Sequence, residues 1–156
     1  MSGRPLRLSV NGKTHEITVP DHRRLLDALR NDLGLEATKE TCGLGACGAC
    51  TVLLDGEPIA SCITLARYAE GKKEVTTLEG IAPDGDLHPL QKSFLKHNAF
   101  QCAFCTPGMI MMASALLEEN PKPSEAEIRE HMAGNICRCT TYHEIIQAIK
   151  DAHTFA

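Results

Sequence analysis

The sequence lacks tryptophan, and aromatic residues make up only 4% of its 156 residues. The core must therefore be built from aliphatic side chains and methionine. No stretch approaches the roughly 20 consecutive apolar residues that cross a bilayer, so no membrane span is expected. An excess of positive charge is missing too, because 16 Lys and Arg stand against 20 Asp and Glu, for a net charge of −4. Without a basic surface, the protein is not expected to bind nucleic acid.

The N-terminus, MSGRPLRLSV, contains neither an apolar signal core nor a twin-arginine pair, so we expect a cytoplasmic protein. Eight cysteines are the one unusual feature, although their share lies below the roughly 8–10% that marks a disulfide scaffold. In a reducing cytosol, thiolates that bind metal are more common than structural disulfides. The cysteines form two sets of four: Cys42, Cys47, Cys50 and Cys62, then Cys102, Cys105, Cys137 and Cys139.

The first set has the C-x4-C-x2-C spacing of a plant-type 2Fe–2S site, with Cys62 as the fourth ligand. Gly43, Gly45 and Gly48 would let the loop adopt positive φ and turn its N–H groups toward the anionic sulfurs. Zinc also binds four thiolates, but its ligands usually come as two short-spaced pairs. A phosphate-binding loop would need a Gly-Lys-Ser or Gly-Lys-Thr sequence, which this loop does not have. The spacing therefore favours an iron–sulfur cluster over zinc.

The second set consists of two pairs, Cys102-Ala-Phe-Cys105 and Cys137-Arg-Cys139, each just before a predicted helix. Helix N-termini carry partial positive charge, so two of them aimed at one anionic cluster would stabilise its reduced form. Two separated pairs also suit zinc, and a C-x-x-C before a helix occurs in thioredoxin-like dithiols, although no preceding strand is evident. Considered alone, this set is therefore less specific than the first.

Sequence patterns predict an α+β fold that begins with a β-grasp domain over residues 1–79, which contains the first set of cysteines. Alternating apolar residues flank the turn signals Asn11-Gly12 and Asp55-Gly56, which predict two hairpins. A helix capped by Asp21 is expected over 22–33, because leucines recur there at helical spacing. A last strand is expected over 75–78. A mixed sheet crossed by one helix is the β-grasp pattern.

The second half of the chain changes to helical periodicity. Residues 80–89 contain glycine and proline and are expected to be a linker. Residues 90–156 are predicted to form a four-helix bundle domain. Ser124 with Glu127, and Thr141 with Glu144, have the spacing of capping boxes. The expected helices cover about 89–98, 107–119, 124–133 and 142–153.

Three motifs together resemble the small iron–sulfur subunit of the molybdenum hydroxylases, the family of xanthine dehydrogenase and of bacterial carbon monoxide, aldehyde and N-heterocycle dehydrogenases. The resemblance covers nearly the whole chain. The motifs are the Cys42–Cys50 loop with Cys62, Gln-Cys-Ala-Phe-Cys-Thr-Pro-Gly-Met-Ile at 101–110, and Gly-Asn-Ile-Cys-Arg-Cys-Thr at 134–140.

The resemblance implies an electron-transfer subunit with a plant-ferredoxin-like 2Fe–2S domain over residues 1–79 and a helical domain over 90–156. Each domain would hold one 2Fe–2S cluster on its four cysteines. Its partners would be a large subunit carrying molybdenum on molybdopterin cytosine dinucleotide and a medium subunit carrying FAD, in a heterotrimer or a dimer of heterotrimers. The complex would oxidise an N-heterocycle, an aldehyde or a similar small molecule, with water as the oxygen source. By the same resemblance, the second set lies nearest molybdenum and the first lies toward FAD. Gln101 and Cys139 would contact the pterin, and no catalytic residue is expected in this chain.

Two positions depart from the family pattern, because Ala103 and Thr141 stand where glycine is usual. Ala103 would be tolerated if its φ is negative, and Thr141 would replace a flexible helix cap with a side-chain cap. A free-standing two-cluster ferredoxin and a double-zinc structural protein are the alternative interpretations of the chain.

Overall fold

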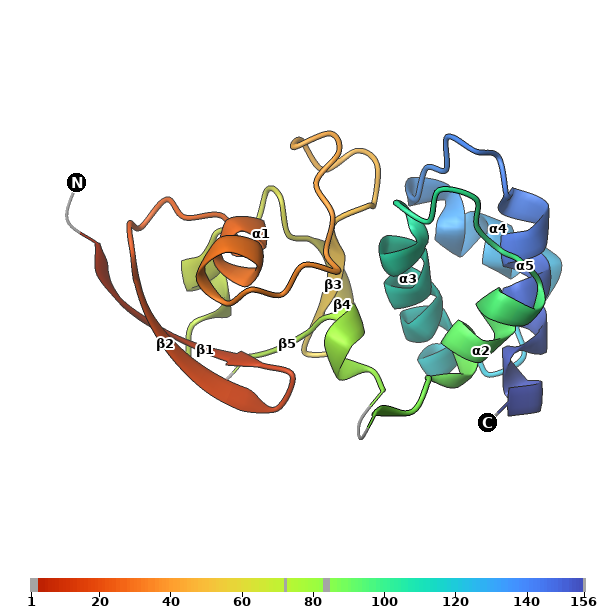
Figure 1. Cartoon of the computed structure of the whole chain (residues 1–156), viewed down its shortest axis with the longest axis horizontal. Helices are drawn as coiled ribbons and strands as arrows, with labels where there is room; N and C mark the ends of the chain where they lie inside the picture. The colour runs from red at the N-terminus through yellow and green to blue at the C-terminus, as the bar shows by residue number, and fades with distance from the viewer. Residues whose placement is uncertain (1–2, 72, 83–84, 156) are drawn as a thin grey trace.

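The described residues, 3–71, 73–82 and 85–155 of a computed structural model, form a mixed sheet followed along the chain by a group of α-helices (Figure 1). The sheet has five strands in the order β2-β1-β5-β3-β4. Strands β1 and β5 are parallel, and the other neighbouring pairs are antiparallel. The strands are β1 (Arg4–Val10), β2 (Lys13–Val19), β3 (Thr51–Leu54), β4 (Glu57–Ala60) and β5 (Glu74–Thr76).

Both predicted hairpins are present, and each is closed by a two-residue turn. Asn11 and Gly12 have φ of 52° and 72°, and Asp55 and Gly56 have φ of 53° and 88°. Positive φ at both central residues is the signature of the type I′ turn, whose twist matches that of the flanking strands. The Asn-Gly and Asp-Gly signals therefore fix the register of the two hairpins.

The helix that crosses the sheet is shorter than predicted. It consists of α1 (Leu25–Asp27) followed by a π-helical turn, η1 (Ala28–Asp32), and its N-cap residue is Arg24. The expected cap by Asp21 is wrong, because the carboxylate of Asp21 accepts hydrogen bonds from the guanidinium groups of Arg4 and Arg67 instead. A charge-assisted pairing with two arginines competes successfully with a single capping bond.

The described residues of the second half form four α-helices at the predicted places, within a few residues at each end. The Ser124–Glu127 capping box is formed, as expected. The predicted box of Thr141 with Glu144 is not formed, because the Thr141 side chain makes no capping hydrogen bond. Of the predicted linker, residues 83 and 84 lie outside the described residues. The helices are α2 (Pro89–Lys96), α3 (Thr106–Glu119), α4 (Glu125–His131) and α5 (Tyr142–Asp151).

The buried apolar side chains form one cluster between the sheet and α1 and another among α2–α5. Helix α3 packs against β3 and β4, so that the helices adjoin one edge of the sheet (Figure 1). Figure 1 also shows the long loop between η1 and β3 reaching toward the start of α3. Within the described part of the chain, no helix has the length and apolar character needed to cross a bilayer.

Candidate metal centres

The first set of cysteines lies in the loop before β3 and just after β4. Cys50 and Cys62 are each only 2% exposed, whereas Cys42 and Cys47 are half-buried. Leu26 of α1 packs against Cys50 and Cys62 and covers their buried side. The set therefore has a protected half beneath α1 and a half nearer the solvent.

The loop that carries these cysteines is shaped by its glycines. Gly43, Gly45 and Gly48 have φ of 66°, 78° and 70°, as the sequence predicts. The loop turns its amides inward, and the Ala46 N–H donates to the Cys42 Sγ over 3.3 Å. An N–H contact from Leu44 is the largest influence on Cys42; with the neighbouring Cys47 thiol and the Ala46 N–H, it lowers the Cys42 pKa to about 6. The loop is thus arranged to stabilise negative charge on sulfur.

Burial has the opposite effect on the inner thiol of this set. Desolvation, followed by the neighbouring Cys50 thiol, raises the pKa of Cys62 to about 11. A buried thiol of this kind becomes a thiolate when a metal ion replaces its proton. The inner half of the site therefore favours thiolates that are bound to a metal cation over free, uncompensated thiolates.

The second set brings together residues far apart in the chain, at the beginnings of α3 and α5. Cys105 is the N-cap residue of α3. The Sγ atoms of Cys139 and Cys102 lie 3.5 Å apart. Burial, and then the adjacent Cys137 thiol, raises the pKa of Cys105 to about 12. The Phe104 N–H, followed by the Cys139 thiol, lowers the pKa of the exposed Cys102.

Both sets are organised as pairs of thiols. Among the described residues, no three His, Cys, Asp or Glu side chains are grouped as a site for a single metal ion would require. The Cys102 and Cys139 sulfurs are in contact, and the thiols of Cys47, Cys50 and Cys137 are among the main influences on the pKa values of Cys42, Cys62 and Cys105, respectively. Two pairs in each set match the needs of a 2Fe–2S cluster, in which each tetrahedral iron takes two of the four thiolates.

The two sets meet through hydrogen bonds to main-chain carbonyls of the first loop. The Ile136 N–H donates to the Cys47 carbonyl over 2.9 Å, and the buried Asn135 Nδ2 donates to the Gly48 carbonyl over 3.2 Å. Gly108 at the start of α3 lies so close to this loop that a Cβ there would be 2.2 Å from the Gly48 carbonyl oxygen. The loop of the first set therefore rests directly on residues that flank the second set.

The predicted pterin contacts, Gln101 and Cys139, lie together. The Gln101 Nε2 donates to the Cys139 carbonyl over 3.2 Å. Gln101 is exposed and Cys139 is half-buried, so this corner of the second set faces outward. The sequence alone did not identify Asn135, whose buried amide joins the two sets. The sequence pattern that could have pointed to Asn135 is a polar residue between Gly134 and the apolar Ile136, next to a cysteine pair.

The structure corrects both expectations for the positions where glycine is usual. Ala103 has a φ of 59°, so the condition of a negative φ is not met, and the loop between Cys102 and Cys105 holds an alanine in the left-handed region. Thr141 has a negative φ of −77° but does not cap α5 with its side chain. Its hydroxyl lies 3.2 Å from the Cys137 Sγ instead, because the side chain points back toward the cysteine pair.

Exposed apolar side chains surround both sets of cysteines. Leu44 and Ile63 are 67% and 61% exposed beside the first set. Phe104, Ile136 and Tyr142 are exposed beside the second. Clustered exposed apolar side chains are typical of surfaces that bind another protein.

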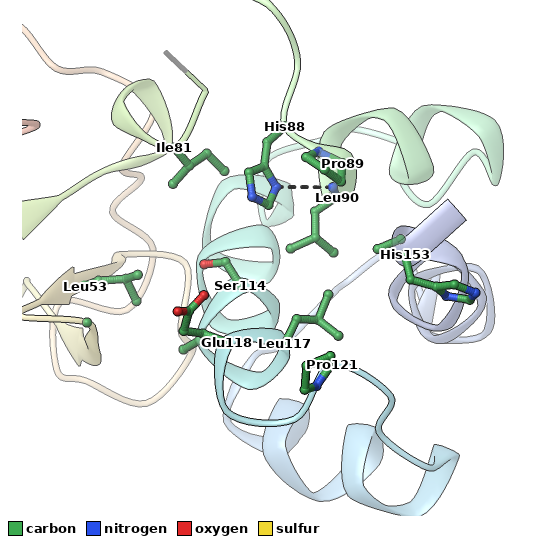
Figure 2. A pocket seen from close by; sticks show the side chains of 13 residues that line it. Leu53, Ile81, His88, Pro89, Leu90, Ser114, Leu117, Glu118, Pro121 and His153 are labelled. Carbon is green, nitrogen blue, oxygen red and sulfur yellow. Dashed lines mark hydrogen bonds between the residues drawn. The ribbon is translucent and has the colours of Figure 1, made fainter. Parts of the chain in front are cut away.

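A cavity of about 570 Å³ lies away from the cysteines, where the β3–β4 turn adjoins α2 and the last turns of α3 (Figure 2). Its walls include Leu53, Ile81, His88 and Glu118, and none of the eight cysteines is among its lining residues. Figure 2 shows the His88 Nδ1 accepting a hydrogen bond from the Leu90 N–H at the start of α2. In this position His88 serves as a helix cap.

Comparison with known families identifies the class of protein as a 2Fe–2S iron–sulfur protein. Residues 8–78 match the model of the 2Fe-2S iron-sulfur cluster binding domain, and residues 77–150 match the model of the [2Fe-2S] binding domain. Each match contains one complete set of four cysteines. The resident cofactors are therefore 2Fe–2S clusters.

The chain belongs to the family of small iron–sulfur subunits of the molybdenum hydroxylases. It is 47% identical to the nicotinate dehydrogenase small FeS subunit of Eubacterium barkeri, over 94% of this chain and 93% of that protein. It is also similar to the structure of quinoline 2-oxidoreductase from Pseudomonas putida 86, at 47% identity and a TM-score of 0.92, covering 97% of this chain and 94% of that one.

A further similarity is to the aldehyde oxidoreductase of Desulfovibrio desulfuricans, at 45% identity and a TM-score of 0.90. The match covers 95% of this chain but only 17% of that protein. These relatives favour an iron–sulfur subunit of an oxidoreductase complex over a free-standing ferredoxin and over a double-zinc protein.

Proposed function

We propose that the chain is the subunit that relays electrons, one at a time, from a molybdopterin centre on a large subunit to FAD on a medium subunit. The observation that carries the proposal is the hydrogen bond from the Ile136 N–H to the Cys47 carbonyl, which joins the two sets of paired thiols through the main chain. When bound, a 2Fe–2S cluster would supply one-electron redox chemistry at each set. The thiols at 42, 47, 50 and 62 would hold one cluster, and those at 102, 105, 137 and 139 the other.

The chain would hold and tune the clusters rather than catalyse the reaction. Inward N–H groups such as that of Ala46 offset the negative charge of the sulfurs, and burial beneath α1 limits water at Cys50 and Cys62. The start of α3 and the start of α5 add partial positive charge at the second set. These contributions favour a stable, reversibly reducible cluster without any proton-transfer residue.

We infer the direction of transfer from the family resemblance, and what each set presents outward is consistent with it. The second set would lie nearest the pterin, with Gln101 and Cys139 in contact with it, because these two residues form a joined, outward-facing corner. The first set would lie toward FAD, with Leu44 and Ile63 as apolar contacts for the medium subunit. Phe104 and Ile136 would serve the same purpose toward the large subunit.

We infer a two-domain layout, with a β-grasp domain over 1–79, a linker over 80–89 and a four-helix bundle domain over 90–156. Support comes from the two separate apolar clusters and from the two family matches, which meet near residue 78. A cytoplasmic location would keep all eight thiols reduced for cluster assembly. The assembly would be a heterotrimer or a dimer of heterotrimers.

The reaction of the whole complex would be hydroxylation of a small N-heterocycle or aldehyde, with water as the oxygen source. The relatives named for nicotinate, quinoline and aldehydes support this substrate range. The large subunit would carry the substrate site and its molybdenum on molybdopterin cytosine dinucleotide.

The test is native purification of the tagged chain from its own organism, followed by cofactor analysis. We expect iron and acid-labile sulfide in equal amounts, two of each per set of cysteines, together with molybdenum and flavin in larger partner chains. The matched variants Cys50→Ser and Cys105→Ser should each perturb one of two 2Fe–2S EPR signals. Zinc without labile sulfide would overturn the proposal, and a cluster-loaded chain without molybdenum or flavin would favour a free-standing ferredoxin.

A further inference from the structure

The side chain of Thr141 lies against one of the candidate ligand sulfurs. Its Oγ1 is 3.2 Å from the Cys137 Sγ, and both residues are 5% exposed. Thr141 occupies the N-cap position of α5, yet its hydroxyl makes no capping hydrogen bond with the helix. The hydroxyl is therefore directed at the sulfur rather than at the backbone N–H groups that a threonine in this position usually serves.

The surroundings of the Cys137 sulfur suit a thiolate that accepts hydrogen bonds. Cys137 is buried, and the Thr141 hydroxyl lies within hydrogen-bonding distance of its sulfur. A thiolate has no proton to give, so in the ionised state the hydroxyl must be the donor. A hydrogen bond to an ionised acceptor in a buried site is stronger than one between neutral groups.

The first set of cysteines provides a comparison within the same chain. There the Cys42 Sγ accepts from backbone N–H groups, those of Leu44 and Ala46, and interacts with the Cys47 thiol. Backbone donors persist whatever the side chains are, whereas the side-chain donor at Cys137, the Thr141 hydroxyl, can be removed by a single substitution. The two sets therefore differ in a way that mutation can isolate.

We propose that Thr141 is a positioning residue that raises the reduction potential of the cluster held by the second set, by donating a hydrogen bond from its hydroxyl to the Cys137 thiolate. The proposal rests on the proposed function, in which Cys137 is a cluster ligand. Reduction adds one electron to the cluster and moves no proton, so the sulfurs become more electron-rich. The hydroxyl bond strengthens with that added charge and favours the reduced state.

The test is an EPR-monitored redox titration of the complex carrying wild-type chain, Thr141→Val, Thr141→Ser or Thr141→Gly. Valine has nearly the shape of threonine without the hydroxyl, serine keeps the hydroxyl, and glycine removes the whole side chain. At the wild-type midpoint of the second-set cluster, we expect valine and glycine to lower the ratio of reduced to oxidised cluster about tenfold, a shift of about 59 mV for a one-electron couple. Serine should retain the wild-type midpoint.

The other cluster is the internal control, because its ligands are not bonded to Thr141. The Cys105→Ser variant assigns the EPR signal of the second set. An unchanged midpoint in the valine variant, or a serine variant shifted as far as valine, would overturn the proposal. If the valine variant does not assemble, the glycine variant takes its place. An unchanged midpoint in the glycine variant, or a serine variant shifted as far as glycine, would then overturn the proposal. Absence of both 2Fe–2S signals from the wild-type complex would instead overturn the proposed function.

Discussion

The main-chain N–H of Ile136 donates a 2.9 Å hydrogen bond to the main-chain carbonyl of Cys47. Cys47 belongs to the first set of cysteines, and Ile136 immediately precedes Cys137 of the second. A continuous path of covalent bonds and one hydrogen bond therefore connects a thiol of each set. Because this hydrogen bond joins two main-chain groups, its length is set by how the loop before β3 rests on the segment between α4 and α5, beside the start of α3.

Substitution of Gly108 by alanine should disturb this link. The added Cβ would lie 2.2 Å from the Gly48 carbonyl oxygen, so either the loop or the start of α3 must move. We expect the free energy of unfolding to fall by about 1–3 kcal/mol, as for other overpacked positions. We also expect a weaker magnetic interaction between the two clusters in the EPR spectrum of the fully reduced complex. Gly134→Ala is the matched control, since a Cβ there meets no atom within 4 Å. Equal spectra for both variants would contradict this account.

The left-handed conformation of Ala103 predicts an unusual order of stability among variants. Its φ of 59° is unfavourable for a residue with a Cβ and worse for a β-branched one. Ala103→Gly should leave the free energy of unfolding within about 1 kcal/mol of wild type, because relief of strain is offset by the greater freedom of glycine when unfolded.

Ala103→Val should increase the backbone strain at this position, whereas glycine relieves it. It should lower the free energy of unfolding by about 1–3 kcal/mol and reduce the iron content of the second set. Urea unfolding of the iron-loaded chain, with iron analysis, measures both effects. A valine variant as stable as wild type would mean that this loop adapts freely.

His88 should make the stability of the chain depend on pH. Burial lowers the pKa of His88, and its Nδ1 accepts a hydrogen bond from the Leu90 N–H, which requires an unprotonated nitrogen. A group whose pKa is lower in the folded state contributes stability above its unfolded pKa of about 6.5 and loses it as the pH falls from there through the folded pKa. The free energy of unfolding should therefore fall more steeply below about pH 6.5 in the wild type than in His88→Asn.

Asparagine is the matched substitution at position 88, because it caps helices well and does not titrate. The difference between the two pH profiles isolates His88 from the other histidines. Urea unfolding of the iron-loaded chain from pH 7.5 to pH 5.5 provides the measurement. Parallel profiles would show that protonation of His88 costs the fold nothing.

Ser93 should contribute to the packing of α2 on α5. Its side chain is fully buried, and its Oγ donates to the Ala148 carbonyl over 2.6 Å. Ser93→Ala should lower the free energy of unfolding by about 1–2 kcal/mol, since it removes a buried hydrogen bond between two helices. Ser114→Ala is the matched control, because that hydroxyl bonds to the Met111 carbonyl within its own helix. Its effect should stay within about 0.5 kcal/mol, measured in the same urea series.

Much of the fold could be predicted because its signals are local. The Asn-Gly and Asp-Gly turns define their hairpins, and the Ser124–Glu127 capping box marks the beginning of α4. The cap of α1 could not be predicted, because Asp21 accepts a hydrogen bond from Arg67, which lies 46 residues further along the chain. A local pattern does not reveal a competitor that only the fold brings near.

The candidate site shows the same division between local and long-range information. Cysteine spacing predicts which residues form each set and that the glycines of the first loop have positive φ. It does not reveal the contact of the Thr141 hydroxyl with Cys137, since that depends on how α5 begins. Nor does it reveal that Asn135 spans from one set to the other, because Gly48 lies 87 residues away in sequence.

The main-chain nature of the Ile136–Cys47 contact leaves the outward side chains around it free to vary. Ile136 can be exchanged for another residue without loss of the amide that it donates, and Leu44 projects from the same loop as Cys47 without taking part in the contact. Evolution could therefore change both proposed docking surfaces to suit new partners, while the distance between the two sets that an electron must cross stays constant. In these two short segments, partner binding would depend on side-chain atoms, whereas electron transfer between the sets would depend on main-chain atoms.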